Sequence, residues 1–173
     1  MESKANNIMF RSPEVLLCNT LIEKGMKVAT AESCTGGMIA AKITAVPGAS
    51  ECFDCGVVTY SNEQKEKLLG VNHKTLEEYG AVSEQTALEM CKGSKNISGA
   101  DVAISVTGIA GPGGGTPEKP VGTVWIGVCS NSMHKAIKFL FKGDRNAVRQ
   151  QTAMIALEMA RRAALGLDVD PRV

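Results

Sequence analysis

The fold is decided by residues 28–65, VATAESCTGGMIAAKITAVPGASECFDCGVVTYSNEQK, where two apolar segments flank a glycine turn and a helix. Residues 27–31 predict a short strand, residues 36–45 a small-residue helix, and residues 52–60 a second strand rich in β-branched side chains. A strand that enters a helix through a Gly-Gly turn brings unpartnered backbone N–H groups to the helix N-terminus, where an anion can bind. This stretch is therefore a candidate ligand site.

The same stretch carries hydroxyl groups and side chains that are able to activate one of them. Ser33 and Ser50 are candidate nucleophiles, and Tyr60 and Lys65 are candidate activating groups. A tyrosine and a lysine at this spacing are more often ordinary surface residues, so the pair alone establishes no site.

The composition favours one globular domain and argues against two classes of partner. The chain has 173 residues, of which 44% are hydrophobic and 21% charged, which is ordinary for a soluble protein with a substantial core. A net charge of +1 without a basic run, and an aromatic content of 4%, argue against nucleic acid and membrane partners. No apolar run reaches the roughly 18 residues that a membrane span needs, and residues 1–14 lack a signal-peptide pattern. We expect a cytoplasmic protein.

The remaining segments predict an α/β domain. Helices are expected from Pro13 to near Gly25 and over 63–69, 74–79, 83–95 and from Asp144 onward; strands are expected over 102–107, 121–129 and 136–141. Alternating strands and helices predict a single three-layer α/β/α domain with a mixed, mostly parallel central sheet, because the last two strands meet through a short turn. We assign residues 1–12 to a flexible N-terminal segment, 13–165 to the domain and 166–173 to a C-terminal tail.

A glycine-rich loop follows the most apolar strand. Residues 108–119, GIAGPGGGTPEK, lack the Lys-Ser of a P-loop, and Thr116 stands where the dinucleotide motif needs glycine. The loop is either a flexible connection or part of a site, since sites in α/β sheets collect where strands end.

The cysteines and histidines give weaker signals. Cys52 and Cys55 are too few for a cysteine zinc site, and in a strand they point to opposite faces, so packing is favoured over redox chemistry. Cys34 is a nucleophile candidate only if a helix N-terminus lowers its pKa. With only His73 and His134 available, a hydroxyl nucleophile needs another base, and a lysine of lowered pKa can serve.

Seven ordered blocks of sequence then resemble a known family. The blocks are TAESCTGG (30–37), PGAS (47–50), GVVTYSNEQK (56–65), GAVSE (80–84), SVTGIAGPGGG (105–115), EKPVGTVW (118–125) and GDRNAVR (143–149). Together they resemble the CinA C-terminal domain family over roughly residues 14–162. Members of that family with established activity are nicotinamide-nucleotide amidohydrolases.

The resemblance implies an enzyme and a set of site residues. The implied reaction is hydrolysis of the carboxamide of nicotinamide mononucleotide to nicotinate mononucleotide and ammonia, in pyridine-nucleotide (NAD) salvage. The implied catalytic residues are the nucleophile Ser50 with Tyr60 and Lys65. The implied substrate-binding residues are Ser33, Thr35, Gly36, Thr107, Gly108, Gly111 and Arg145.

The implied chemistry needs no metal, ATP or redox cofactor, so we expect no cofactor. The resemblance also implies a homo-oligomer, with the nucleotide as the partner molecule. The alternative is a nucleotide-binding module without catalysis, associated with competence or DNA damage. Such a module would keep the glycine loops and Arg145 but would not need the three catalytic residues.

Overall fold

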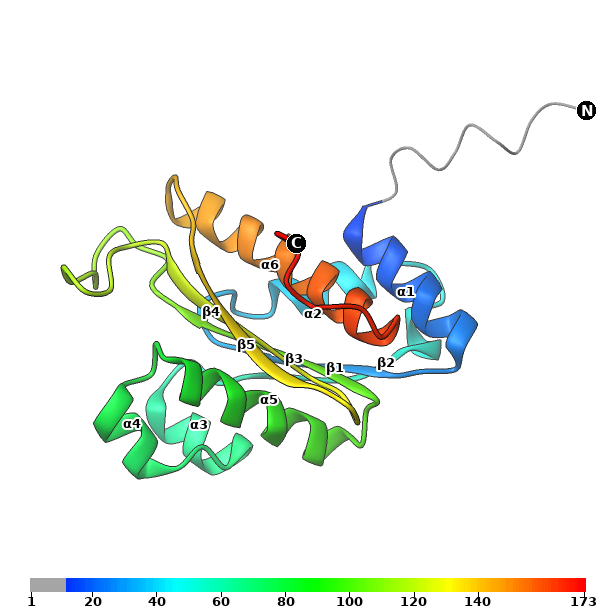
Figure 1. The fold of residues 1–173 in the computed structure, drawn as a ribbon, viewed down its shortest axis with the longest axis horizontal. Coiled ribbons are helices and arrows are strands. Elements are labelled where there is room, and N and C mark those ends of the chain that lie inside the picture. The colour runs from blue at the N-terminus through cyan, green and yellow to red at the C-terminus, as the bar shows by residue number, and fades with distance from the viewer. Residues whose placement is uncertain (1–11) are drawn as a thin grey trace, which may run out of the picture.

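One five-stranded sheet lies between two layers of helices in the computed structural model, which describes residues 12–173 (Figure 1). The strands are β1 (Val28–Glu32), β2 (Phe53–Val58), β3 (Val102–Gly108), β4 (Thr123–Cys129) and β5 (His134–Leu140). The helices are α1 (Pro13–Lys24), α2 (Met38–Thr44), α3 (Asn62–Leu69), α4 (His73–Tyr79), α5 (Glu84–Ser98) and α6 (Arg145–Ala164), with a 3₁₀ turn η1 (Ala49–Glu51). The expected helices and strands are all present, with ends that differ by a few residues.

The sheet is mixed, in the order β2-β1-β3-β4-β5. Strand β1 pairs in parallel with β2 and β3, whereas β4 is antiparallel to both β3 and β5. Only β4 therefore runs against the other strands, which confirms a mixed and mostly parallel sheet. The parallel part brings the carboxyl ends of β1, β2 and β3 to one edge.

Helices cover both faces of the sheet, which confirms the three-layer prediction. Helices α1, α2 and α6 lie on one face, and α3, α4 and α5 on the other (Figure 1). The side chains of β3 are buried along Val102–Thr107 because α6 packs on one side of the strand and α5 on the other. Strand β3 is thus the central buried strand that its apolar sequence predicts.

The helix ends follow from short polar side chains and glycines. The Ser83 hydroxyl accepts from the Thr86 N–H, and the Asp144 carboxylate accepts from the Ala147 N–H, so these residues cap the helices that were expected to begin there. Gly25 and Gly99 take left-handed backbone just after α1 and α5.

The predicted flexible segment lies outside the described residues, apart from Ser12 at the start of α1. The predicted tail lies against the domain: Val169 is fully buried and Lys135 pairs with Asp168 at 3.0 Å. Among residues 12–173, no helix combines the length and apolar character needed to cross a bilayer.

Candidate active site

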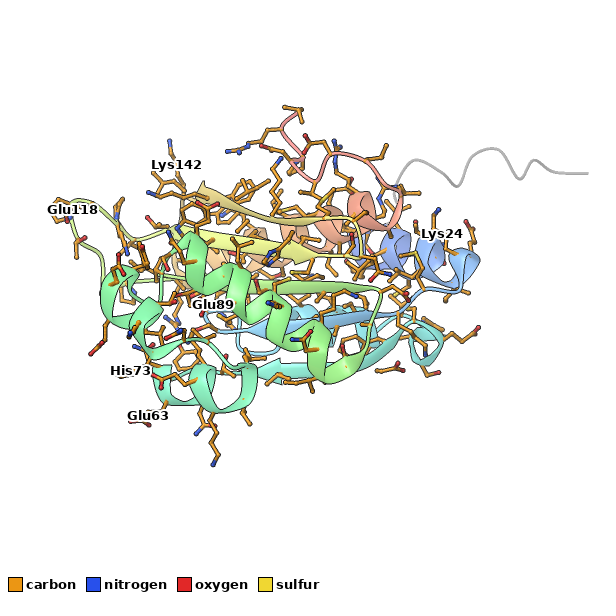
Figure 2. The ribbon with its side chains drawn as sticks, turned by 60° about the horizontal axis from the view of Figure 1, so that its bottom comes forward. Lys24, Glu63, His73, Glu89, Glu118 and Lys142 are labelled. Carbon is orange, nitrogen blue, oxygen red and sulfur yellow. The ribbon has the colours of Figure 1, made fainter. Side chains whose placement is uncertain are left out.

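Polar groups gather at the edge where the three parallel strands end. Ser33 directly follows β1, Thr59 and Tyr60 follow β2, and Thr107 and Gly108 close β3. Figure 2 separates the two ends of the molecule: Glu118, in the loop after β3, projects at one end, and Lys24, just before β1, lies at the other. The carboxyl edge of an open α/β sheet is where such folds bind ligands.

Lys65 is buried at this edge and contacts a serine. It lies on α3 with only 1% of its surface exposed. Its Nζ donates to the Thr59 carbonyl at 2.8 Å and to Ser33 Oγ at 3.1 Å. Burial disfavours the charged ammonium and lowers the pKa of Lys65 from its ordinary value. A neutral lysine amine can keep the bond to Thr59 and accept the hydroxyl proton of Ser33.

A pocket opens over this pair. Its volume is about 220 Å³, and two basic side chains, Lys65 and Arg145, reach it. Its lining consists of Ser33, Cys34, Tyr60, Asn62, Lys65, Ala81, Val82, Thr107, Gly108, Ala110 and Arg145. No Asp or Glu stands among these described residues, so the pocket favours an anionic ligand.

Arg145 closes one side of the pocket and fixes Tyr60. It is the first residue of α6. It donates to the Gly111 carbonyl and to the Tyr60 hydroxyl, both at 2.7 Å. These two bonds use two of the five N–H donors of the guanidinium, which leaves others to bind a ligand. Tyr60 thus accepts a hydrogen bond from Arg145. Within residues 12–173, no hydrogen bond joins Tyr60 to Lys65, so the structure does not pair these two residues as expected.

Ser50 does not line this pocket, so the structure does not bring Ser50 and Lys65 together as the resemblance implied. Ser50 is exposed in η1, before β2 begins, where its carbonyl accepts from Lys27 Nζ at 3.2 Å. Lys65 follows the other end of β2, and a six-residue strand spans about 20 Å. The structure instead places Ser33 beside Lys65.

The expected anion site at the start of α2 is also wrong, because a carboxylate already occupies it. Glu32 is buried with 1% of its surface exposed, and it accepts from the N–H groups of Gly37, Ile39 and Ala40 at 2.9–3.1 Å. A negatively charged side chain is stabilised at this position by the helix dipole. An anionic ligand therefore has to bind elsewhere.

The other predicted binding residues divide into lining residues and supports. Thr107 and Gly108 line the pocket, although the Thr107 hydroxyl donates to the Ala81 carbonyl at 2.7 Å. Gly108 has to be glycine, because an added Cβ would lie 2.7 Å from the Thr123 carbonyl oxygen. Thr35 and Gly36 belong to the turn beneath the pocket: Thr35 is fully buried, and Gly36 has a left-handed φ of 60°.

The cysteines and histidines contribute no evident catalytic group. Burial raises the pKa of the Cys34 thiol to about 11, so this thiol is protonated at neutral pH. His73 lies on the outside of α4 (Figure 2). Its ring Nδ1 lies 3.0 Å from a carboxylate oxygen of Glu66. Within residues 12–173, no cluster of three or more His, Cys, Asp or Glu side chains could hold a metal ion.

Sequence reasoning missed Arg149, which supports the turn that carries Ser33. Arg149 Nε donates to the Cys34 carbonyl at 3.2 Å, and a terminal nitrogen donates to the Thr35 carbonyl at 2.7 Å. The available signal was the spacing of Arg145 and Arg149, because residues four apart share one face of a helix.

Comparison with known proteins places this chain in a family. The family model described as the CinA C-terminal domain matches residues 11–164. A CinA-like protein of Kosmotoga olearia is 50% identical over 156 residues, which cover 90% of this chain and 38% of that protein. A putative competence-damage inducible protein of Clostridium perfringens is 52% identical over 155 residues, which cover 90% of this chain and 38% of that protein. The chain thus spans about two fifths of the length of these curated relatives.

Solved structures agree with the sequence relatives. A CinA superfamily protein of Klebsiella pneumoniae has a TM-score of 0.85 at 36% identity, covering 90% of this chain and 99% of that one. A competence/damage inducible protein of Agrobacterium tumefaciens has a TM-score of 0.78 at 42% identity, covering 87% of this chain and 95% of that one. This chain belongs to the CinA C-terminal domain family.

Proposed function

We propose that this domain is an amidohydrolase that converts nicotinamide mononucleotide to nicotinate mononucleotide and ammonia. The observation that carries the proposal is the contact between Lys65 Nζ and Ser33 Oγ at 3.1 Å, at the base of a pocket without acidic side chains. A hydroxyl beside a buried amine of lowered pKa is the arrangement of a serine nucleophile with its base.

The reaction proceeds in two halves. The Ser33 oxygen attacks the carboxamide carbon while neutral Lys65 takes the hydroxyl proton. The tetrahedral intermediate then breaks its C–N bond, and Lys65 returns the proton to the departing nitrogen, so that ammonia leaves. Water next attacks the resulting ester with Lys65 as base, which releases the carboxylate product and restores Ser33.

The pocket rim suits the rest of this substrate. The free donors of Arg145 match the oxygens of a phosphate, which an arginine binds with charge-assisted hydrogen bonds. The ring of Tyr60, 63% exposed at the pocket, offers an aromatic face to the cationic pyridinium ring. Both groups bind the ligand and neither needs to move a proton.

The test compares two serines. Purified protein is incubated with nicotinamide mononucleotide and ammonia release is measured for Ser33→Ala and for the matched control Ser50→Ala. We expect Ser33→Ala to lose kcat by about 10⁴-fold or more, as serine hydrolases do without their nucleophile, and Ser50→Ala to keep it. An active Ser33→Ala protein would refute the nucleophile assignment. Binding of the nucleotide without ammonia release by the unmutated protein would favour the non-catalytic alternative.

A further inference from the structure

The turn after Ser33 contains two backbone N–H groups that no acceptor within residues 12–173 uses. Among the residues that the structure describes, neither the Cys34 N–H nor the Thr35 N–H donates a hydrogen bond. Both residues are buried, with exposures of 6% and 0%. More than about 90% of buried backbone N–H groups in proteins have a partner, so two consecutive exceptions need an explanation.

The carbonyl groups of the same two peptide units both accept hydrogen bonds. The Ser33 carbonyl accepts from the Gly36 N–H at 3.0 Å, and the Cys34 carbonyl accepts from Arg149 Nε at 3.2 Å. In a trans peptide the N–H points away from its own C=O. Fixing these two carbonyls therefore fixes the directions of the Cys34 and Thr35 N–H groups.

These groups are separate from the N-terminus of α2. The first N–H groups of that helix donate to the Glu32 carboxylate, which leaves the Cys34 and Thr35 groups as the open donors in the segment from Ser33 to Met38. They directly follow the serine that contacts Lys65. Cys34 lines the same pocket, and Thr35 belongs to the turn just beneath it.

We propose that the Cys34 and Thr35 N–H groups form the oxyanion hole for Ser33, and that Arg149 is the residue that positions the Thr35 group. The inference rests on the proposed function. When Ser33 attacks the amide, the carbonyl oxygen gains the negative charge, and nearby backbone donors stabilise that charge. A donor directly after the nucleophile, at a turn from strand to helix, is also how other serine hydrolases build this site.

Arg149 acts from outside the pocket. Its bond to the Cys34 carbonyl holds the peptide unit whose other end is the Thr35 N–H, and a bond on one side of a peptide strengthens donation on the other. Its second bond is donated to the Thr35 carbonyl at 2.7 Å. The planar guanidinium thus holds two carbonyls at once with two fixed N–H donors, which a lysine cannot reproduce.

The first experiment removes one donor without changing a side chain. Thr35 is replaced by its α-hydroxy acid, which converts the peptide N–H to an ester oxygen, and turnover of nicotinamide mononucleotide is measured. We expect kcat to fall by about 10²- to 10³-fold with KM nearly unchanged, as for other lost oxyanion donors. The pyridine-3-carbaldehyde analogue of the substrate, which forms a hemiacetal with a serine, should lose affinity in parallel. Normal kcat in the ester variant would overturn the proposal.

The second experiment uses ordinary mutants and guards against a misfolded ester variant. Arg149→Lys should lower kcat by about 10- to 100-fold with KM nearly unchanged, the effect of a misplaced catalytic group. Arg161→Lys is the matched control, because Arg161 lies on the same helix and forks onto Glu158 away from the pocket. Equal kcat values for the two variants would refute the role of Arg149. Unmutated protein without ammonia release would overturn the proposed function and this inference together, whereas an active protein with unaffected variants would overturn the oxyanion hole alone.

Discussion

Replacing Lys65 by methionine tests the base directly, because methionine keeps an unbranched side chain and removes the amine. The amine lies 3.1 Å from Ser33 Oγ, within direct proton-transfer reach. Loss of a base in such a unit lowers kcat by about 10⁴-fold or more, which corresponds to about 5.5 kcal/mol at 1.36 kcal/mol for each tenfold change. Because Ser33 and Lys65 act on one proton, the double variant Ser33→Ala/Lys65→Met should be little slower than either single variant.

The pH dependence provides the second half of this test. Protonated Lys65 has no lone pair to accept the serine proton, so kcat/KM should rise with pH and level off at the lowered pKa, below 10.5. Ammonia release measured from pH 5 to 10 should show this limb in the unmutated protein, and Lys65→Met should lack it. Additive losses, or an unchanged limb in Lys65→Met, would refute the assignment of Lys65 as base.

The free energy of unfolding should also depend on pH through Lys65, and the direction of the change can be derived. Burial lowers the folded-state pKa of Lys65, so the unfolded chain binds more protons between that pKa and about 10.5. The free energy of unfolding should therefore increase with pH across this window, and Lys65→Met should flatten the increase. Urea unfolding at several pH values measures the slope.

Three further predictions concern residues near the carboxyl edge of the sheet. Arg145→Ala should raise KM by about 10- to 100-fold, the value of a charged hydrogen bond, and should reduce the preference for the mononucleotide over nicotinamide riboside; an unchanged KM would remove Arg145 from the site. Tyr60→Phe should mainly raise KM and keep the alkaline rise in rate, because its hydroxyl bonds Arg145; loss of that rise would return Tyr60 to the proton path. Glu32→Gln should lower the free energy of unfolding by roughly 2 kcal/mol, since three N–H groups lose a carboxylate; an unchanged urea midpoint would contradict this.

The secondary structure and the layer order could be predicted because local signals agree with the tertiary fold. The Ser83 and Asp144 caps, the glycines after helices and the uniformly apolar β3 each correspond to what the structure shows. Such features depend on a few neighbouring residues, so a sequence contains enough information to place them.

The serine that contacts Lys65 was not predicted correctly: the resemblance implied Ser50, whereas the structure places Ser33 against Lys65. Ser50 lies fifteen positions before Lys65 and Ser33 thirty-two, yet Ser33 is the residue that contacts it. In a parallel sheet, a residue after one strand lies near a residue after the neighbouring strand, and a residue before the strand lies at the far edge. Ser33 and Tyr60 both follow strands and Ser50 precedes one, so strand direction held the missing information.

Glu32 and Arg149 were missed because their roles depend on distant partners. A glutamate at the end of an apolar strand indicates nothing by itself, until the backbone folds three N–H groups onto it. Arg149 reaches a turn more than a hundred residues earlier in the chain. Contacts of this kind follow from packing α6 across the sheet and have no local sequence pattern.

Under the proposed function, helix α6 links substrate binding and catalysis. One face of its first two turns carries Arg145, which contacts Tyr60 and Gly111 at the pocket rim, and Arg149, which holds the turn after Ser33. The helix is capped by Asp144 and packs on β3, β4 and α1, so both arginines start from a rigid element. A small shift of α6 would move the phosphate contact and the oxyanion donors together. Core substitutions under α6, such as Val148→Ala, should therefore change KM and kcat jointly, whereas Arg145 and Arg149 variants separate the two.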